Sequence, residues 1–339
     1  MRATLRDLGI GLGRLPSGPT NTVADVGARL GHRTIVFGDG PLRVGHGPAR
    51  TGVSVLVPPG EAPWTAACHV INGYGKTMGL IQVAELGTLE SPIFFTNTLS
   101  VGAVQQGYLR HLRHIGAFHP RRSHNVLVSE CNDGHLSDLW GLHVRPADAG
   151  RALADARRGE VVQGSVGAGT GMVAYGHKGG FGTASRRTPA GATVAALVLA
   201  NCGRPEELRL GGVPVGEDGG VAEPPPGSII IALVTDAATD THSLGRIAAR
   251  ATHGLARTGT ISANGSGDVA IALTTGRGPD APIDELFLAA IESTEEAIWN
   301  ALCTAEDCTG RDGHTVRALD HGAVRRAWAR AHGAAGWDV

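Results

Sequence analysis

Residues 264–268, Asn-Gly-Ser-Gly-Asp, place a serine hydroxyl directly before an apolar, β-branched run from Val269 to Thr275. The run predicts a buried strand, and the five residues before it are turn formers. An ordinary loop explains such a turn, because Asn-Gly and Gly-Asp favour tight turns by themselves. The alternative is that Ser266 is a nucleophile held at the start of a rigid strand.

A serine hydroxyl becomes a good nucleophile only when a base takes its proton. Fifteen histidines are candidates for that base, but Ser266 is not part of a G-x-S-x-G elbow, and its turn precedes a strand instead of a helix. A free α-amine is another candidate, since its pKa of roughly 7.7–8 leaves much of it unprotonated near neutral pH. A serine at a chain's N-terminus would therefore carry nucleophile and base together.

To create that terminus, the Ser266 hydroxyl would attack the Gly265 carbonyl, and water would cleave the resulting ester. Glycine suits the position before the cut, because a residue without a Cβ tolerates a strained carbonyl and a close approach.

Composition excludes several other classes of protein. The 339 residues carry a net charge of −1, and no basic patch suggests nucleic acid. The five scattered cysteines predict neither a disulfide framework nor a zinc site. Gly167–Gly171 lacks the spacing and the following acidic residue of a dinucleotide site. No segment is long and apolar enough for a signal peptide or a membrane span, so we expect a cytoplasmic protein without metal or cofactor.

The positioning elements follow from the hydrophobic pattern, which predicts a layered α/β protein with helices outside the sheets. No linker divides the chain, so we expect one domain covering residues 1–339. The pattern predicts two helices, 243–257 with Ser243 as its N-cap and 283–302. It also predicts buried strands at 53–57, 125–128, 193–200, 229–235 and 269–275.

Ordered blocks along nearly the whole chain resemble the self-processing serine aminopeptidase family, which includes the L-aminopeptidase/D-Ala-esterase/amidase, the β-aminopeptidases and the nylon-oligomer hydrolases. The block GLARTGTISANGSGD at 254–268 contains the family's processing site, which makes Ser266 the implied N-terminal nucleophile. The other blocks are LGIGLGRLPSGPTNTVADVGARLGH at 8–32, TNTLSVG at 96–102, SECNDGHLSD at 129–138, GSVGAGTGMVAYGHKGGFGTASR at 164–186, LANCGRPEELRLGGVPVG at 199–216 and TGRDGHTV at 309–316.

The resemblance also implies roles for residues outside this turn. Asn201 would donate to the oxyanion, although this chain has Asn-Cys-Gly where many relatives have Asn-Tyr-Gly. Lys178 would stabilise the oxyanion or keep the α-amine neutral by repulsion. Thr304 and Glu306 would orient the Ser266 amine and hydroxyl, with Asp307 as a competing choice.

Asn132 and Asp133 match a further block and would line the substrate pocket, although both also suit an ordinary turn.

As a whole, the resemblance implies a four-layer αββα sandwich cut into an α chain, 1–265, and a β chain, 266–339. The expected reaction is hydrolysis of an amide or ester next to a free amino group of small peptides, through an acyl-enzyme on Ser266. Relatives assemble as homo-oligomers of αβ units, often tetramers. The alternatives are a nylon-oligomer-type endo-hydrolase, an acyl transferase of the ornithine acetyltransferase type, and an uncleaved assembly scaffold.

Overall fold

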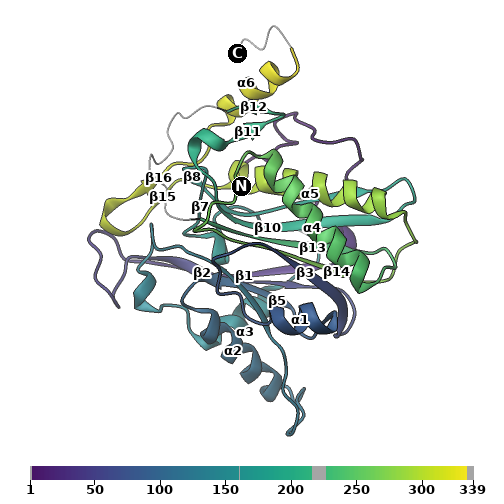
Figure 1. Cartoon of the computed structure of the whole chain (residues 1–339). Coiled ribbons are helices and arrows are strands. Elements are labelled where there is room, and N and C mark those ends of the chain that lie inside the picture. The colour runs from purple at the N-terminus through teal and green to yellow at the C-terminus, as the bar shows by residue number, and fades with distance from the viewer. Residues whose placement is uncertain (1, 160, 216–226, 334–339) are drawn as a thin grey trace.

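Two β-sheets lie face to face in the computed structural model, which describes residues 2–159, 161–215 and 227–333. Helices cover the outer face of each sheet (Figure 1). The predicted four-layer αββα architecture is therefore confirmed.

The first sheet has the strand order β1, β2, β5, β6. Its outer face packs against helices α2 (Val101–His114) and α3 (Pro146–Asp155). The strands are β1 (Arg29–Phe37), β2 (Ala49–Val57), β5 (Ile93–Asn97) and β6 (Leu127–Cys131).

The second sheet has the order β4, β3, β14, β13, β10, β9. Helices α4 (Thr241–Arg257) and α5 (Ile283–Thr304) cover its outer face. Strand β14 is internal, antiparallel to β3 and parallel to β13. The strands are β4 (Thr88–Leu89), β3 (Trp64–Gly73), β14 (Gly267–Thr274), β13 (Ser228–Thr235), β10 (Thr193–Asn201) and β9 (Gly180–Arg187).

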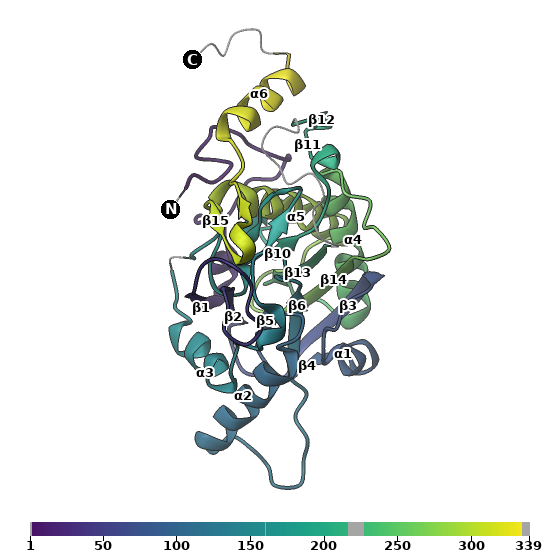
Figure 2. The ribbon, with the colours of Figure 1, turned by 90° about the vertical axis from the view of Figure 1, so that its left-hand side faces the viewer.

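Shorter elements surround this sandwich. Helix α1 (Leu80–Leu86) packs beside β3, and α6 (His321–Ala331) lies beyond α5, away from the sheets (Figure 2). Two-residue strands form three small ladders: β7 (Val173–Ala174) with β8 (His177–Lys178), β11 (Arg209–Leu210) with β12 (Val213–Pro214), and β15 (Cys308–Thr309) with β16 (Thr315–Val316).

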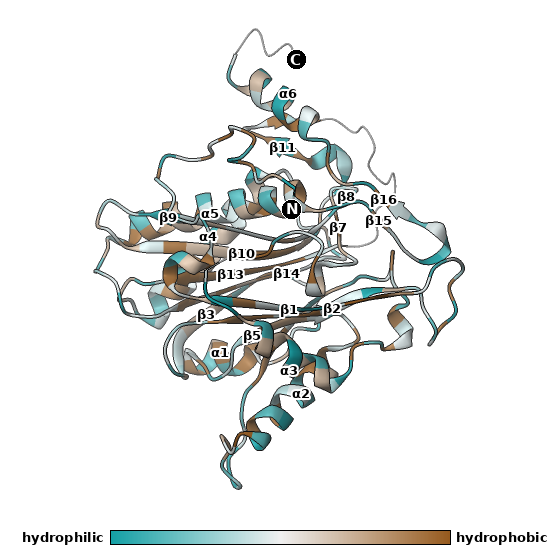
Figure 3. Cartoon of the chain, turned by 180° about the vertical axis from the view of Figure 1, so that it is seen from behind, coloured by the Kyte–Doolittle hydropathy of each residue, from teal (hydrophilic) through white to brown (hydrophobic). Residues whose placement is uncertain are grey.

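The apolar side chains form separate cores between these layers. Alternate residues of β14 contribute to two of them: Val269 and Ile271 lie between the sheets, whereas Ala270 and Ala272 lie under the helices. Strands β10, β13 and β14 are accordingly apolar on both faces, as Figure 3 shows by their brown colour. This explains why their sequences lack polar–apolar alternation.

Both predicted helices and three of the five predicted strands are confirmed within one or two residues at each end. The strand predicted at 53–57 is part of β2, which begins four residues earlier, at Ala49. The predicted strand at 125–128 begins later, at Leu127, because Asn125 instead donates from its side chain to the Gly79 carbonyl. The predicted cap of α4 is wrong. Asp240 is the N-cap and accepts a hydrogen bond from the Ser243 N–H at 2.7 Å.

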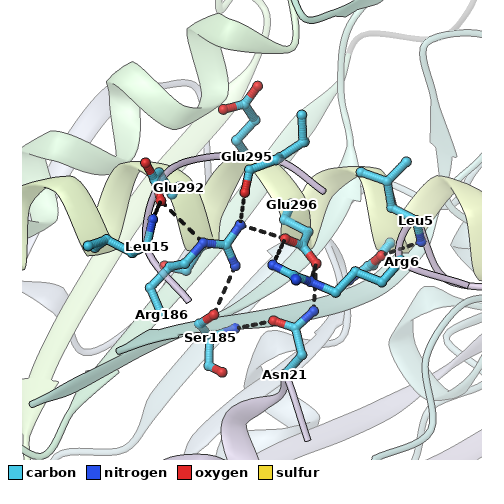
Figure 4. A network of polar contacts seen from close by, with 12 residues as sticks. Leu5, Arg6, Leu15, Asn21, Ser185, Arg186, Glu292, Glu295 and Glu296 are labelled. Carbon is cyan, nitrogen blue, oxygen red and sulfur yellow. Dashed lines mark hydrogen bonds and ion pairs between the residues drawn. The ribbon is translucent and has the colours of Figure 1, made fainter. Parts of the chain in front are cut away.

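A buried network of charges ties the N-terminal segment to α5 (Figure 4). The Arg186 guanidinium, fully buried on β9, lies 3.3 Å from a Glu292 oxygen and 2.5 Å from a Glu296 oxygen. Glu296 also pairs with Arg6 at 2.8 Å and accepts from the Asn21 amide at 2.5 Å. Both carboxylates of this network, Glu292 and Glu296, thus have a charged partner, which offsets the cost of burying them.

None of the described helices is long and apolar enough to cross a membrane.

Candidate active site

Ser266 lies directly before β14, and only 5% of its surface is exposed. Its backbone N–H donates to the Ala263 carbonyl at 2.8 Å, which closes the predicted turn over Asn264 and Gly265. In the intact chain this nitrogen is an amide and carries no basic lone pair. As the sequence predicts, the serine lies at the start of a buried strand; we call this N-terminal end of β14 its head.

Asn72, on the neighbouring strand β3, holds the same turn from the side. Its amide nitrogen contacts the carbonyl oxygens of Ala263 at 3.2 Å, Asn264 at 3.1 Å and Ser266. Among the hydrogen bonds of the described residues, none reaches the Gly265 carbonyl oxygen. The turn is therefore fixed around the one carbonyl that the hydroxyl would attack.

The Ser266 hydroxyl donates to Asp268 Oδ1 at 2.5 Å. Asp268 is fully buried, and its Oδ1 also accepts from the Ile229 N–H at 3.1 Å. Its Oδ2 forms no hydrogen bond of ordinary geometry with a described group, although Ser262 faces the carboxylate. Burial raises the pKa of Asp268, while the hydrogen bonds from Ser266 and Ile229 and the nearby Ser262 hydroxyl oppose that rise.

Asp268 lies in the Asn-Gly-Ser-Gly-Asp segment, but no role was predicted for it. The signal was present, because residues two apart on a strand share a face.

Three of the predicted site residues lie together at the same end of the sandwich. The Asn201 side chain accepts from the Val173 N–H at 2.8 Å through Oδ1 and donates to the Asn132 carbonyl at 3.1 Å through Nδ2. Asn132 and Asp133 directly follow β6. In cross-strand register, Asn201 aligns with Ser228 of β13, which aligns with Gly267 of β14.

Asp133 is fully buried, and neither of its carboxylate oxygens has a hydrogen-bond partner of ordinary geometry among the described residues. Burial raises the pKa of Asp133 to about 7. Thr51 and Asn97 face the carboxylate and pull its pKa in the opposite direction, and the charge of Glu130 adds to the rise.

Glu130, at the end of β6, is a second buried carboxylate that the sequence analysis missed. One of its oxygens accepts from the Lys76 N–H at 2.7 Å, and the other accepts from the Thr98 hydroxyl. A Cβ added to Gly75 would lie 3.6 Å from Glu130 Oε1 and 3.6 Å from Gly267 Cα, so the carboxylate lies close to the head of β14. Glu130 and the head of β14 lie together only because the first sheet packs on the second.

Asn201 and the Ser266 hydroxyl do not touch in the intact chain. Asn201 lies two residues after Leu199 on β10, so its side chain is on the same face of the sheet, the one between the two sheets. Asp268 lies two residues before Ala270 on β14, so the two side chains are on the same face of the sheet, under the helices. The Ser266 hydroxyl is hydrogen-bonded to Asp268. The predicted nucleophile and the predicted oxyanion donor therefore lie on opposite faces at one end of the same sheet.

Lys178 is fully buried and donates to three backbone carbonyls, those of Gly169 at 3.0 Å, Met172 at 2.9 Å and Gly179 at 2.9 Å. Burial lowers its pKa to about 8. The Lys178 ammonium thus fixes the backbone around Met172, and the next N–H, of Val173, orients the Asn201 amide. A direct contact with Ser266 is not among its described contacts, and its catalytic role stays a prediction.

Thr304, Glu306 and Asp307 make other contacts in the intact chain. The Thr304 hydroxyl donates to the Asn300 carbonyl of its own helix at 2.6 Å. The Glu306 side chain is exposed, and Asp307 pairs with Arg317 at 2.6 Å. The partner of the Ser266 hydroxyl is Asp268 instead, so any role of these three residues in a cleaved enzyme stays a prediction.

Across residues 2–159, 161–215 and 227–333, no three His, Cys, Asp or Glu side chains are grouped as a metal site.

The sequence profile of peptidase family S58 matches residues 21–316. The β-peptidyl aminopeptidase BapA of Sphingosinicella microcystinivorans is 37% identical, over 94% of this chain and 90% of that protein. The solved β-aminopeptidase of a Burkholderia species is 40% identical with a TM-score of 0.88, over 100% of both chains. The L-aminopeptidase D-Ala-esterase/amidase of Ochrobactrum anthropi, described as a variant of the Ntn hydrolase fold, is 35% identical with a TM-score of 0.88, over 97% of this chain and 99% of that one.

Proposed function

Since the chain belongs to peptidase family S58 and is an aminopeptidase, we propose that Ser266 is its nucleophile and that it matures by cutting its own Gly265–Ser266 bond. The products are an α chain, 1–265, and a β chain, 266–339. One observation carries this proposal: a buried hydroxyl at the head of an internal strand, hydrogen-bonded to a carboxylate at 2.5 Å.

The cut changes the chemistry of Ser266 because it turns an amide nitrogen into a free α-amine. That amine takes the hydroxyl proton, the hydroxyl attacks the substrate carbonyl, and the amine returns the proton to the leaving nitrogen. Water then hydrolyses the acyl-enzyme by the same route.

The cut also removes the constraint on Ser266. In the intact chain its nitrogen is tied to the preceding turn through Ala263. Once that connection is broken, the hydroxyl can rotate toward the space between the sheets, where the Asn201 amide has a second proton to donate to the oxyanion.

An aminopeptidase must also bind the ammonium group of its substrate. Glu130 supplies a buried carboxylate close to the head of β14. Its two oxygens are already oriented by Lys76 and Thr98, so its geometry is fixed before the substrate arrives. We assign Asn132 and Asp133 to the wall of the same pocket.

For the substrate we propose small peptides and amino-acid amides whose first residue is a β-amino acid. The similarity to a β-peptidyl aminopeptidase and to a β-aminopeptidase supports this choice over an α-amino acid. A panel of p-nitroanilides compares the two classes: β-alanyl and β-homoamino-acid anilides against L-alanyl, D-alanyl and N-acetylated ones. A higher kcat/KM for an N-acetylated compound than for its free-amine form would exclude an aminopeptidase.

Intact-mass analysis of purified protein tests maturation. We expect two fragments that meet between Gly265 and Ser266 instead of one 34.8 kDa chain. Ser266→Ala should remain uncut and inactive, whereas Ser123→Ala, at an exposed position in a distant loop, should be cut. An active but uncut wild-type protein would exclude the mechanism.

We further propose that the αβ units assemble into a homo-oligomer, a tetramer by analogy with the family, in the cytoplasm. Light scattering coupled to gel filtration measures the mass of the assembly directly. A monomeric αβ unit would contradict this part of the proposal.

A further inference from the structure

We propose that Asp268 is the general base of the self-cleavage step, and that it acts on the intact chain before the α-amine of Ser266 exists. This inference rests on the proposed cut at Gly265–Ser266 and deepens it. It assigns a catalytic residue to maturation, distinct from the base of the mature enzyme.

The intact chain needs such a residue because its nucleophile lacks the later base. Until the bond breaks, the Ser266 nitrogen is an amide that donates to the Ala263 carbonyl, so it cannot take a proton from the hydroxyl. The partner that the hydroxyl has in this state is Asp268 Oδ1, at 2.5 Å. The hydroxyl proton that has to leave is therefore already hydrogen-bonded to an acceptor, Asp268 Oδ1.

The surroundings of Asp268 suit proton transfer. Its Oδ1 is held by the Ile229 N–H at 3.1 Å, and its Oδ2 has no partner of ordinary geometry among the described residues. Burial moves the pKa of this carboxyl upward, toward neutrality, and a carboxylate with a raised pKa is a stronger base than an ordinary one.

Glu130 lies close to the head of the same strand. The thiols of Cys131 and Cys202 lie near enough to Asp268 for its charge to raise their pKa values. Burial raises the pKa of both thiols well above the ordinary value, so both stay neutral at the pH where Asp268 is ionised.

Self-cleavage is a transfer of the Gly265 acyl group from nitrogen to oxygen, followed by hydrolysis. Asp268 takes the hydroxyl proton while Ser266 Oγ forms a bond to the Gly265 carbonyl carbon. The carbon–nitrogen bond between Gly265 and Ser266 then breaks, and Asp268 returns the proton to the departing nitrogen. The result is an ester between the Gly265 carbonyl and Ser266 Oγ, with a free amine. Water hydrolyses this ester to a carboxylate on Gly265 and restores the hydroxyl.

Asp268→Asn tests this role with little change of shape. The amide keeps an oxygen that can accept from the Ile229 N–H and the Ser266 hydroxyl, but it cannot take a proton. The protein is made by cell-free translation, transferred to buffers between pH 5 and 8, and sampled over time for intact mass. We expect cleavage at Gly265–Ser266 to slow by at least roughly 10²-fold in the variant, and the fall of the wild-type rate at low pH to be lost.

Asp236→Asn is the matched control, because Asp236 also accepts a backbone N–H, that of Thr193 at 2.7 Å, but at the other end of the same sheet. It should be cut at the wild-type rate. Near-UV circular dichroism checks that each variant is folded. If Asp268→Asn does not fold, Asp268→Glu decides: its cleavage should persist with a shifted pH profile, and an unshifted profile would overturn the assignment.

Hydroxylamine separates attack from hydrolysis because it cleaves an ester that has already formed. The reaction is run on folded protein at neutral pH and the cut is located by mass, since the Asn264–Gly265 bond is itself sensitive under denaturing alkaline conditions. Asp268→Asn should stay intact with and without hydroxylamine. If hydroxylamine alone releases the fragments, the ester forms without Asp268 and the assignment is wrong.

The two proposals fail in different ways. An uncut wild type refutes the proposed maturation and this assignment with it. A wild type and an Asp268→Asn variant that are cut at the same rate refute this assignment alone.

Discussion

Asp133 is expected to destabilise the protein at neutral pH, and the effect can be measured as a function of pH. Its pKa in the folded protein is about 7, against an ordinary value of 3.8. Between these two values the folded state binds more protons than the unfolded state, so stability falls as pH rises through this range. The cost is absent below about pH 4 and complete above about pH 7.

The size of the effect follows from the same two values. They lie about three pH units apart, and each unit corresponds to about 1.4 kcal/mol, so the full cost is about 4 kcal/mol. Asp133→Asn removes the charge at nearly constant shape. The new amide can donate to the Asn97 side-chain oxygen, which has no described hydrogen-bond partner and whose residue faces the carboxylate. An unfolding entropy of about 0.7 kcal/mol/K for a chain of this length converts 4 kcal/mol into about 6 °C.

The assay is thermal unfolding of wild type and Asp133→Asn at pH values from 5 to 8.5, after mass analysis has shown that both proteins are in the same cleavage state. The difference in Tm should grow in favour of the variant up to about pH 7 and then stay constant. Asp138→Asn is the control with the opposite sign. Burial opposes ionisation there too, but hydrogen bonds from His143 and from the Gly47 and Gly45 N–H groups hold the pKa of Asp138 below its ordinary value. This variant should lose stability at neutral pH. An Asp133→Asn variant that is less stable than wild type at pH 8 would refute the reasoning.

Three further predictions concern positions with a defined environment. Asn201→Ala should lower kcat by roughly 10²–10³ in fully cleaved protein if the amide binds the oxyanion; an unchanged kcat would remove it from the site. Gly267→Ala should slow self-cleavage, because its Cβ would come within 2.8 Å of the Gly75 backbone and push the head of β14 away; normal cleavage by intact mass would contradict this. Arg186→Met should destabilise the protein by about 3–5 kcal/mol, because it removes a buried partner from two carboxylates. Arg6→Met, at a partly exposed position, should cost far less, and equal shifts in Tm would argue against the buried network.

The sequence predicts the fold well wherever one local pattern determines an element. The four-layer architecture follows from the resemblance. The buried strands at 193–200, 229–235 and 269–275 follow from apolar runs, because strands covered on both faces are apolar throughout. Strands β1 and β3 are half exposed and mix polar with apolar residues, so no continuous apolar run predicts them.

The candidate site likewise contains some residues that a local sequence pattern predicts and others that it does not. Ser266 is found from five adjacent residues, and Asp268 could have been found with it from the period of a strand. Asn72 reaches the turn only because β3 pairs with β14. Glu130 lies close to the head of β14 only because the first sheet packs on the second. Such contacts depend on strand order, which the sequence does not reveal. Asn201 was predicted by resemblance, but only the register shows which face of the sheet it occupies.

The position of β14 determines what the proposed cut does to the molecule. The shorter product contributes an internal strand, flanked by β3 and β13, together with α5, whose Glu292 and Glu296 hold Arg186 and Arg6 of the longer product. Neither piece can leave without opening the sheet and exposing buried charges, so both stay together in a fixed one-to-one ratio. The bond can break only after these strands have paired around it. If the chain matures by this cut, maturation acts as a check on folding, because a misfolded copy keeps its serine in an amide bond and does not become an active peptidase.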